Sequence, residues 1–162
     1  MIQIIDNFLP EEEFKSIQSF IMGGEFRWFY CEGRSIMDDG LYHMTHMFFQ
    51  SEVGEVVSNS EHLYFWTNFM NKVGAKKCER IKGNLTFNTP TIEPAIFHYD
   101  YPDMKTAIFY INTNDGYTEF ESGVRVASIA NRVCIFDSNL THRGTTHTEP
   151  DPRRIVVNFN YA

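Results

Sequence analysis

The chain has 162 residues, of which 43% are hydrophobic and 15% aromatic, and it carries a formal net charge of −7. This length and composition suit one globular domain over residues 1–162 with a sizeable core, and they exclude an intrinsically disordered chain. The negative charge argues against a nucleic-acid partner, because phosphate binding normally needs clustered Lys and Arg.

Cysteine usage and hydropathy favour a soluble protein of a reducing compartment. The three cysteines are widely spaced, odd in number and without a paired motif, which fits the cytosol better than secretion. The first residues lack the basic-then-apolar order of a signal peptide, and the chain has no long apolar segment. We therefore expect a cytoplasmic protein without a membrane partner; the sequence does not indicate the oligomeric state.

Residues 1–79 are predicted to form a helix-containing N-terminal part that opens with a strand. Pro10, followed by three Glu residues, predicts the start of a first helix, because Pro suits the first turn and negative charge complements the helix dipole. A second helix is expected to begin near Ser58 or Ser60. Each helix carries an apolar stripe that predicts packing on the core: Phe14, Ile17 and Ile21 in the first, and Leu63, Trp66, Met70 and Val73 in the second.

Residues 80–162 read as short strands and turns. Residues 84–88 and 153–161 alternate polar and apolar side chains with a period of two, so each strand has one polar face. Such a face meets either solvent or a ligand-lined cavity. The whole pattern predicts a β-rich α+β fold, namely a double-stranded β-helix (jelly roll) of the cupin kind with the N-terminal helices packed on one sheet.

A candidate metal site lies in the sequence Phe97-His98-Tyr99-Asp100. On a strand, His98 and Asp100 share one face, and His142 could supply a third ligand from a distant segment. Two imidazoles and one carboxylate form the facial triad of non-haem Fe(II) sites, which leaves the opposite face of the metal open. A His-x-Asp triplet also arises by chance, so a structural role for His98 is the alternative.

Other histidines compete with this assignment. His147 lies five residues beyond His142, but residues 133–137 read as a strand that would deliver His142 just past its end. His43 and His46 are three residues apart and have no matching carboxylate or Cys nearby, so they are predicted to face substrate or solvent.

With these motifs the chain resembles the 2-oxoglutarate- and Fe(II)-dependent dioxygenases, particularly the prolyl-4-hydroxylase-like branch and its small single-domain bacterial and phage members. The resemblance implies that His98, Asp100 and His142 hold iron and form the catalytic centre. It also implies that Arg154, twelve positions after His142, binds the far carboxylate of 2-oxoglutarate and that Tyr110 adds a donor. Weaker candidates for orienting donors are Asn84, Asn88, Asn158 and Asn160.

The chemistry of Arg154 and Tyr110 suits that role. A planar guanidinium holds a carboxylate through two parallel charge-assisted hydrogen bonds, and a phenol can add a third. Arg153 is less favoured because it would point to the opposite face of the strand unless a bulge exchanges the two. One departure from the family pattern is Asp115-Gly116-Tyr117-Thr118, which stands where the family commonly has paired glycines.

The resemblance implies an oxidoreductase that uses Fe(II), 2-oxoglutarate and O2, with ascorbate as an optional addition, and releases succinate and CO2. The first expected substrate is a prolyl residue in a peptide or protein; the alternative is a free amino acid or small metabolite. A non-catalytic cupin-like metal-binding or structural module is the alternative of a different class, although such a module needs no dicarboxylate clamp. A hydrolytic zinc enzyme is disfavoured because no convincing general base accompanies the triad.

Overall fold

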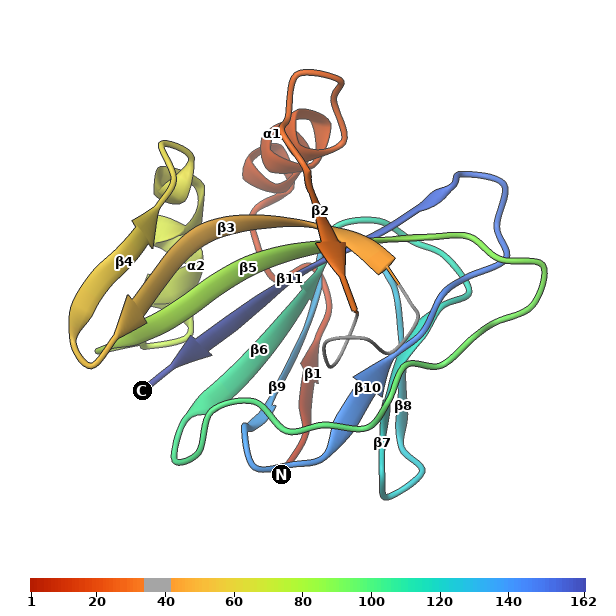
Figure 1. Cartoon of the computed structure of the whole chain (residues 1–162). Coiled ribbons are helices and arrows are strands. Elements are labelled where there is room, and N and C mark those ends of the chain that lie inside the picture. Colours follow the sequence, from red (N-terminus) through yellow and green to blue (C-terminus); the bar gives the residue numbers. More distant parts are fainter. Residues whose placement is uncertain (34–41) are drawn as a thin grey trace.

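The computed structural model describes residues 1–33 and 42–162, and its strands form two antiparallel sheets (Figure 1). The strands are β1 (Gln3–Ile5), β2 (Phe29–Glu32), β3 (Tyr42–Glu52), β4 (Glu55–Asn59), β5 (Cys78–Phe87), β6 (Lys105–Tyr110), β7 (Tyr117–Phe120), β8 (Arg125–Ala127), β9 (Arg132–Asp137), β10 (His142–Gly144) and β11 (Arg153–Tyr161). The large sheet has the order β1-β9-β6-β11-β5-β3-β2, with β4 on β3, and the small sheet has the order β10-β7-β8.

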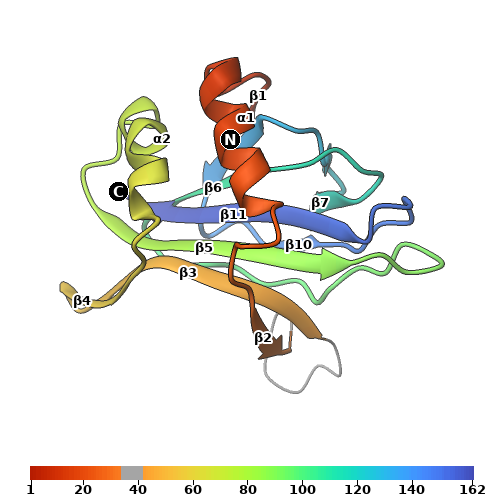
Figure 2. The ribbon, with the colours of Figure 1, turned by 90° about the horizontal axis from the view of Figure 1, so that it is seen from above.

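The helices cover one face of the large sheet (Figure 2). They are α1 (Glu11–Ile21), a 3₁₀ turn (Leu63–Trp66) and α2 (Thr67–Lys72). The apolar stripe of α1 is buried as expected, and aromatic rings fill the space beneath the helices, with Phe69 stacked on Phe159 at 3.9 Å between ring centroids. The predicted jelly roll with helices packed on one sheet is confirmed.

The second helix begins later than expected. Residues 55–59 form β4, because Val56 and its neighbours pair with β3 in an antiparallel hairpin. The helical turn therefore starts at Leu63 rather than near Ser58 or Ser60. The predicted start was wrong because β-branched valines favour a strand here.

The last strand, β11, separates the core from the interior of the jelly roll. Its apolar face belongs to the main core under the helices: Ile155, Val157, Phe159 and Tyr161. Its other face points between the two sheets, where a smaller apolar cluster that includes Tyr110 and Val156 fills part of the space. The predicted alternation is confirmed, and its polar face meets a cavity rather than open solvent.

The segment that carries His98 and Asp100 is less regular than predicted. It runs in extended form between β5 and β6, and among the described residues its β-bridges are isolated ones, Pro94 with Thr145 and His98 with His142. Pro94 and Pro102 lack the backbone N–H that a continuous ladder requires, so a full strand does not form.

No helix within the described ranges is both long enough and apolar enough to cross a membrane. The cysteines Cys31, Cys78 and Cys134 are free thiols. Burial raises the pKa of Cys78 to about 11 and that of Cys134 to about 12, so both stay protonated near neutral pH.

Candidate active site

Two histidines face each other across an antiparallel backbone pair. The N–H of His98 donates to the carbonyl of His142 at 2.9 Å, the N–H of His142 donates back at 2.8 Å, and the ring centroids are 4.7 Å apart. Each ring has its Nδ1 near the carbonyl oxygen two residues earlier, Ile96 at 3.2 Å and Leu140 at 2.9 Å. Because a carbonyl only accepts, Nδ1 carries the proton in the neutral form of each ring, and Nε2 then has the lone pair.

Asp100 completes a cluster with these rings. One potential ligand atom from each of His98, Asp100 and His142 lies within 4.8 Å of the others. Nε2 of His142 is buried and has no hydrogen-bond partner among the described residues. A buried imidazole nitrogen with a free lone pair, next to a second imidazole and a carboxylate, is the donor set of a facial-triad metal site, so the residues present fit an iron ion.

A polar network fixes the carboxylate of Asp100. Its Oδ1 accepts from Nη2 of Arg80 at 3.3 Å, and its Oδ2 accepts from Oγ1 of Thr106 at 2.9 Å and from Nδ2 of Asn160 at 3.0 Å. Arg80 also donates from Nε to Oδ1 of Asn160 at 3.0 Å, and the hydroxyls of Thr106 and Ser138 are 2.7 Å apart. Both oxygens of the carboxylate are therefore oriented before any metal binds.

The same network sets the charges of the cluster. Burial raises the pKa of Asp100, but the Arg80 guanidinium, His142 and the hydrogen bonds from Asn160 and Thr106 outweigh it and hold the pKa below its usual value. Burial lowers the pKa of His142 more than the nearby Asp100 carboxylate raises it. An ionised carboxylate and a neutral imidazole are the forms that bind metal.

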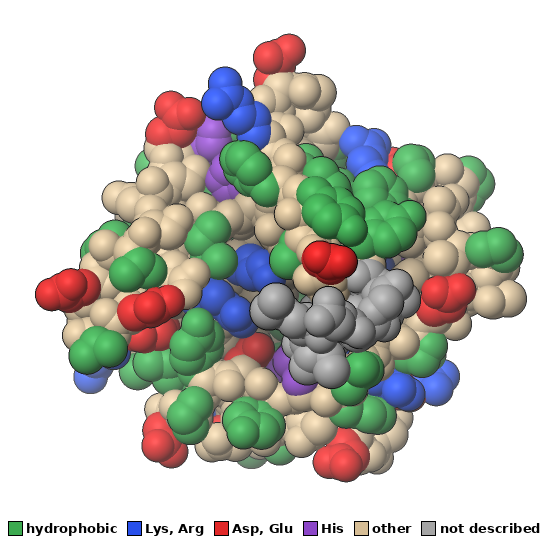
Figure 3. Space-filling model, in the orientation of Figure 1, with side chains coloured by type: hydrophobic (Ala, Val, Ile, Leu, Met, Phe, Trp, Pro, Cys, Tyr) green, Lys and Arg blue, Asp and Glu red, His purple; other side chains and the backbone are tan. Residues whose placement is uncertain are grey.

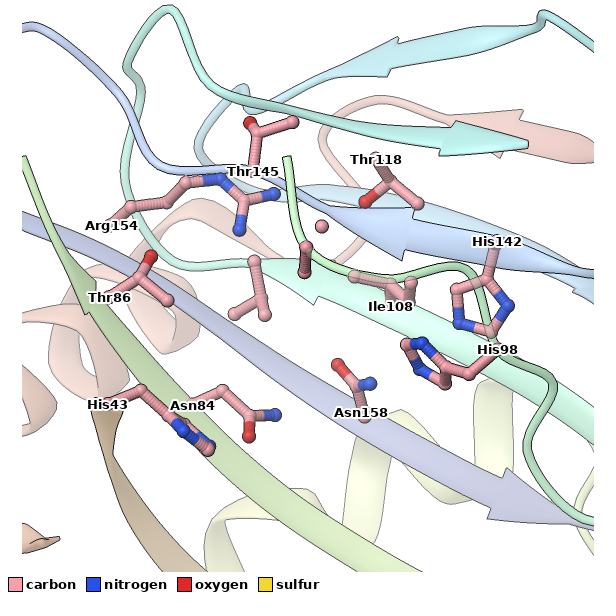
Figure 4. Close-up of a pocket in the computed structure, with 13 residues that line it drawn as sticks. His43, Asn84, Thr86, His98, Ile108, Thr118, His142, Thr145, Arg154 and Asn158 are labelled. Carbon is pink, nitrogen blue, oxygen red and sulfur yellow. The ribbon is translucent and has the colours of Figure 1, made fainter. Parts of the chain in front are cut away.

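A pocket extends from this cluster between the two sheets (Figure 4). It encloses about 600 Å³, its open mouth included. In Figure 4 the side chains of His98 and His142 lie at one end and Arg154 lies at the other. The lining residues are His43, Asn84, Thr86, Ala95, His98, Ile108, Thr118, His142, Gly144, Thr145, Arg154, Val156 and Asn158.

Close packing holds Arg154 at its end of the pocket. The side chain is only 3% exposed, and its Nε donates to Oγ of Ser128 at 2.9 Å. It also lies directly against Gly116: a Cβ there would be 2.7 Å from Cδ of Arg154 and 2.7 Å from the carbonyl oxygen of Thr146. A glycine at position 116 is therefore required for this placement of the guanidinium.

Tyr110 lies behind the pocket wall rather than on it. The ring is fully buried, and its hydroxyl donates to Oγ1 of Thr118 at 2.8 Å. Thr118 is the residue that lines the pocket, and sequence reasoning did not select it. Burial raises the pKa of Tyr110, so the phenol remains a donor.

The four asparagines predicted as weaker candidates divide into three groups. Asn84 and Asn158 line the pocket, whereas Asn160 contacts Asp100 instead. Asn88 lies outside the pocket, exposed, and donates to the carbonyl of Glu149. Arg80 was missed by the sequence analysis, although it continues the alternation of Asn84 and Thr86 along β5.

The remaining competitors lie apart from the metal cluster. The ring of His147 donates from Nε2 to the carbonyl of Asp151 at 2.8 Å. His46 lies between the Arg27 carbonyl, 2.8 Å away, and the Ser60 hydroxyl, 2.9 Å away, whereas His43 lines the pocket. Arg153 donates to Asp151 and to the carbonyl of Met22, away from the pocket.

The molecular surface agrees with this arrangement (Figure 3). On the face shown, basic, acidic and histidine side chains lie together in a central hollow, next to a group of hydrophobic side chains. Charged and histidine side chains are therefore visible on this face of the molecule.

No family model matches the chain, and no curated protein matches its sequence. Solved structures do match it over 99% of its length. A 2OG-Fe(II) oxygenase family oxidoreductase from Burkholderia pseudomallei superposes with a TM-score of 0.74 at 13% identity over 84% of its own chain. A prolyl-4-hydroxylase from Pseudomonas putida gives 0.71 at 12% identity over 91% of its chain.

A third match is a prolyl hydroxylase from Trichoplax adhaerens, in complex with a peptide fragment of hypoxia inducible factor. It gives a TM-score of 0.66 at 14% identity over 82% of its chain. The chain described here therefore has the jelly-roll fold of the 2OG-Fe(II) oxygenases, including the prolyl hydroxylases among them.

Proposed function

We propose that this chain is a non-haem Fe(II)- and 2-oxoglutarate-dependent oxygenase with His98, Asp100 and His142 as its iron ligands. The observation that carries the proposal is the convergence of two Nδ1-tethered imidazoles on an oriented carboxylate, with a buried arginine at the other end of the same pocket. A module that only binds a metal would need the two imidazoles and the carboxylate but not the buried arginine. The shared fold supports the same reaction class.

The residues at the two ends of the pocket would have different roles, iron binding at one end and 2-oxoglutarate binding at the other. Iron held by the three ligands would supply oxygen activation, with 2-oxoglutarate converted to succinate and CO2. Arg154 would bind the far carboxylate of 2-oxoglutarate. The hydroxyl of Thr118 accepts from Tyr110, so its own proton can point into the pocket, and Tyr110 acts as a positioning residue.

A prolyl residue in a peptide or protein is the proposed substrate. Two of the similar structures named above are prolyl hydroxylases, and one of them was solved with a peptide. The pocket is open to solvent on one side, which would allow a residue of a larger chain to approach the proposed iron site. If the protein hydroxylated free amino acids and not peptides, the proposed substrate would change to a free amino acid.

The test is an anaerobic titration of the Fe(II)-loaded protein with 2-oxoglutarate, followed by admission of oxygen. We expect the visible charge-transfer absorption of a chelated complex and then succinate. Proline-containing peptides and free amino acids are then added separately, and mass spectrometry detects an added oxygen atom. A folded, metal-loaded sample that gives neither absorption nor succinate would favour the binding or structural module.

A further inference from the structure

Lys82 is a cation inside the jelly roll that neither the iron ligands nor the proposed cosubstrate clamp uses. Strand β5 alternates regularly here: Arg80 contacts Asp100 on one side of Lys82 in the sequence, and Asn84 lines the pocket on the other. With its period of two, β5 therefore presents Lys82 to the interior between these two residues. Lys82 pairs with Met47 on β3 and with Asn158, a pocket residue, on β11.

The burial of Lys82 is unusual for this chain. It is half-buried, whereas the other five lysines are exposed. Within the described residues its ammonium has neither a hydrogen bond nor an ion pair; Asp100, a nearby carboxylate, is already bonded to Arg80, Thr106 and Asn160. Burial lowers the pKa of Lys82, and the charge of Arg80 lowers it further. An incompletely solvated cation of this kind gains free energy from an anionic ligand.

A second polar group without a partner lies beside it. Oδ1 of Asn158 is buried and has no hydrogen-bond partner among the described residues, although Asn158 lines the pocket. An amide offers both a donor and an acceptor, so it can serve an N–H or a carbonyl group of a ligand. The cation and the amide are cross-strand neighbours, and together they form a polar site for a molecule that carries a carboxylate close to an amide or amine.

This site is distinct from the proposed clamp for 2-oxoglutarate. Arg154 pairs with Thr86 and Asn158 pairs with Lys82, so the two cations are separated by four residues along β5 and β11. At about 3.3 Å per residue, their backbones are about 13 Å apart. The two cations therefore project from separate positions on the sheet.

We propose that Lys82 binds a carboxylate of the primary substrate and that Asn158 hydrogen-bonds to the adjacent amide or amine. The proposal rests on the function proposed above, and it narrows the substrate to an anionic one. The carboxylate can belong to an acidic residue next to the oxidised position of a peptide or to a free amino acid. The chemistry that Lys82 recognises is the same in both.

The test compares carboxylate probes with their uncharged counterparts. Acetylated peptide amides carry Glu, Gln or Lys on either side of a proline, and L-proline is paired with L-prolinamide. Binding to the protein loaded with Fe(II) and 2-oxoglutarate is measured by calorimetry without oxygen, so the result does not depend on turnover. Failure to form succinate would count against the proposed function, whereas the binding preference alone decides the role of Lys82.

We expect the wild-type protein to bind a carboxylate probe about tenfold or more tightly than its amide counterpart, as a charge-assisted hydrogen bond provides. Preference for Glu peptides would identify a side-chain carboxylate, and preference for L-proline would identify a free amino acid. Lys82→Met should remove the preference, Lys82→Arg should keep it, and Lys82→Glu should shift it toward the Lys peptides. Lys77→Met, at an exposed lysine that pairs with Glu79 at the start of the same strand, should leave the preference unchanged.

Three results would overturn the proposal. The first is a wild-type protein with no preference, and the second is a Lys82→Met variant with an unchanged preference. The third is a Lys82→Met variant that loses affinity for 2-oxoglutarate, which would assign the lysine to the cosubstrate. The melting temperature of Lys82→Met should equal or exceed that of the wild type, because the substitution removes an unpaired, half-buried charge.

Discussion

The two ends of the pocket are held in place by different means. At the metal end, the Asp100 carboxylate accepts three hydrogen bonds, and both histidine rings are tethered through Nδ1. At the other end, Arg154 packs against Gly116, where a Cβ would lie 2.7 Å from its Cδ, and its Nε donates to Oγ of Ser128. The proposed metal end therefore depends on a network of donors and acceptors, and the proposed cosubstrate end has no room for added volume between Gly116 and Arg154.

This difference predicts which substitutions each end tolerates. A change that removes one polar atom and keeps the volume should affect the metal end, because a buried carboxylate loses part of its solvation. A change that adds one methyl group should affect the cosubstrate end, because close-packed interiors adapt poorly to added volume. Four sets of variants test this contrast, in order of decreasing effect.

The largest effect is expected for Asp100→Ala. The substitution removes the only carboxylate of the cluster and leaves Arg80 without its anionic partner, so iron-dependent turnover should be abolished. Fe(II) content after dialysis and succinate formation measure the loss. Glu121→Ala, at an exposed position in the turn after β7, is the control and should retain both. Undiminished turnover in Asp100→Ala would rule out His98, Asp100 and His142 as the iron-binding triad.

Arg154→Ala is expected to weaken 2-oxoglutarate binding while iron still binds. Loss of a bidentate charge-assisted contact should raise the KM for 2-oxoglutarate by about 100-fold, or about 2.7 kcal/mol. Steady-state kinetics at saturating Fe(II) and Fe(II) titration separate the two effects.

The matched control for that experiment is Arg153→Ala. Arg153 is adjacent in sequence, points away from the pocket and pairs with Asp151, so its removal should leave the KM unchanged. Equal effects of the two substitutions would contradict the assignment of Arg154.

Sequence periodicity was sufficient to place Arg154 but not to place Tyr110. The alternation along residues 153–161 assigns each side chain to a face, and β11 follows it throughout its apolar face. Tyr110 also faces the interior between the sheets, as its strand predicts, but Thr118 on the opposite sheet stands between it and the pocket. The spacing between two sheets depends on side chains distant in the sequence, so periodicity along one strand could not predict it.

The network around Asp100 shows the same limit. The His-x-Asp spacing predicts that His98 and Asp100 share one face of a strand. The segment is not a regular strand, but the isolated bridge between His98 and His142 keeps the backbone extended there. Arg80, Thr106, Ser138 and Asn160 come from four different strands or strand ends. Nothing in their local sequence indicates a shared carboxylate; their convergence follows from the order of strands in the large sheet.

Gly116→Ala should disturb the cosubstrate end alone. The new Cβ would be 2.7 Å from Cδ of Arg154, which is closer than a real contact allows. It would also be 2.7 Å from the carbonyl oxygen of Thr146, so residue 116 cannot shift toward Thr146 to relieve the clash. A displacement of about 1 Å costs up to about 100-fold in binding or rate, and we expect about a 30-fold rise in the KM for 2-oxoglutarate. Gly24→Ala is the control, because nothing lies within 4 Å of its Cβ position. A strong loss of Fe(II) affinity in Gly116→Ala would show that the two ends are coupled.

The smallest effects should come from a pair of Thr→Val substitutions, one at each end. Thr106→Val removes a donor to Asp100 and should weaken Fe(II) binding about tenfold, the lower end of the range for residues that support metal ligands. Thr118→Val removes the acceptor of the Tyr110 hydroxyl and the proposed donor to 2-oxoglutarate, and should raise the KM for that acid about fivefold. Titration with Fe(II) and kinetics with 2-oxoglutarate should each respond to one variant only. The two threonines share no hydrogen bond among the described residues, so a direct link between them would not explain a common effect. If each variant altered both Fe(II) affinity and the KM for 2-oxoglutarate, the two ends of the pocket would be coupled through the rest of the fold.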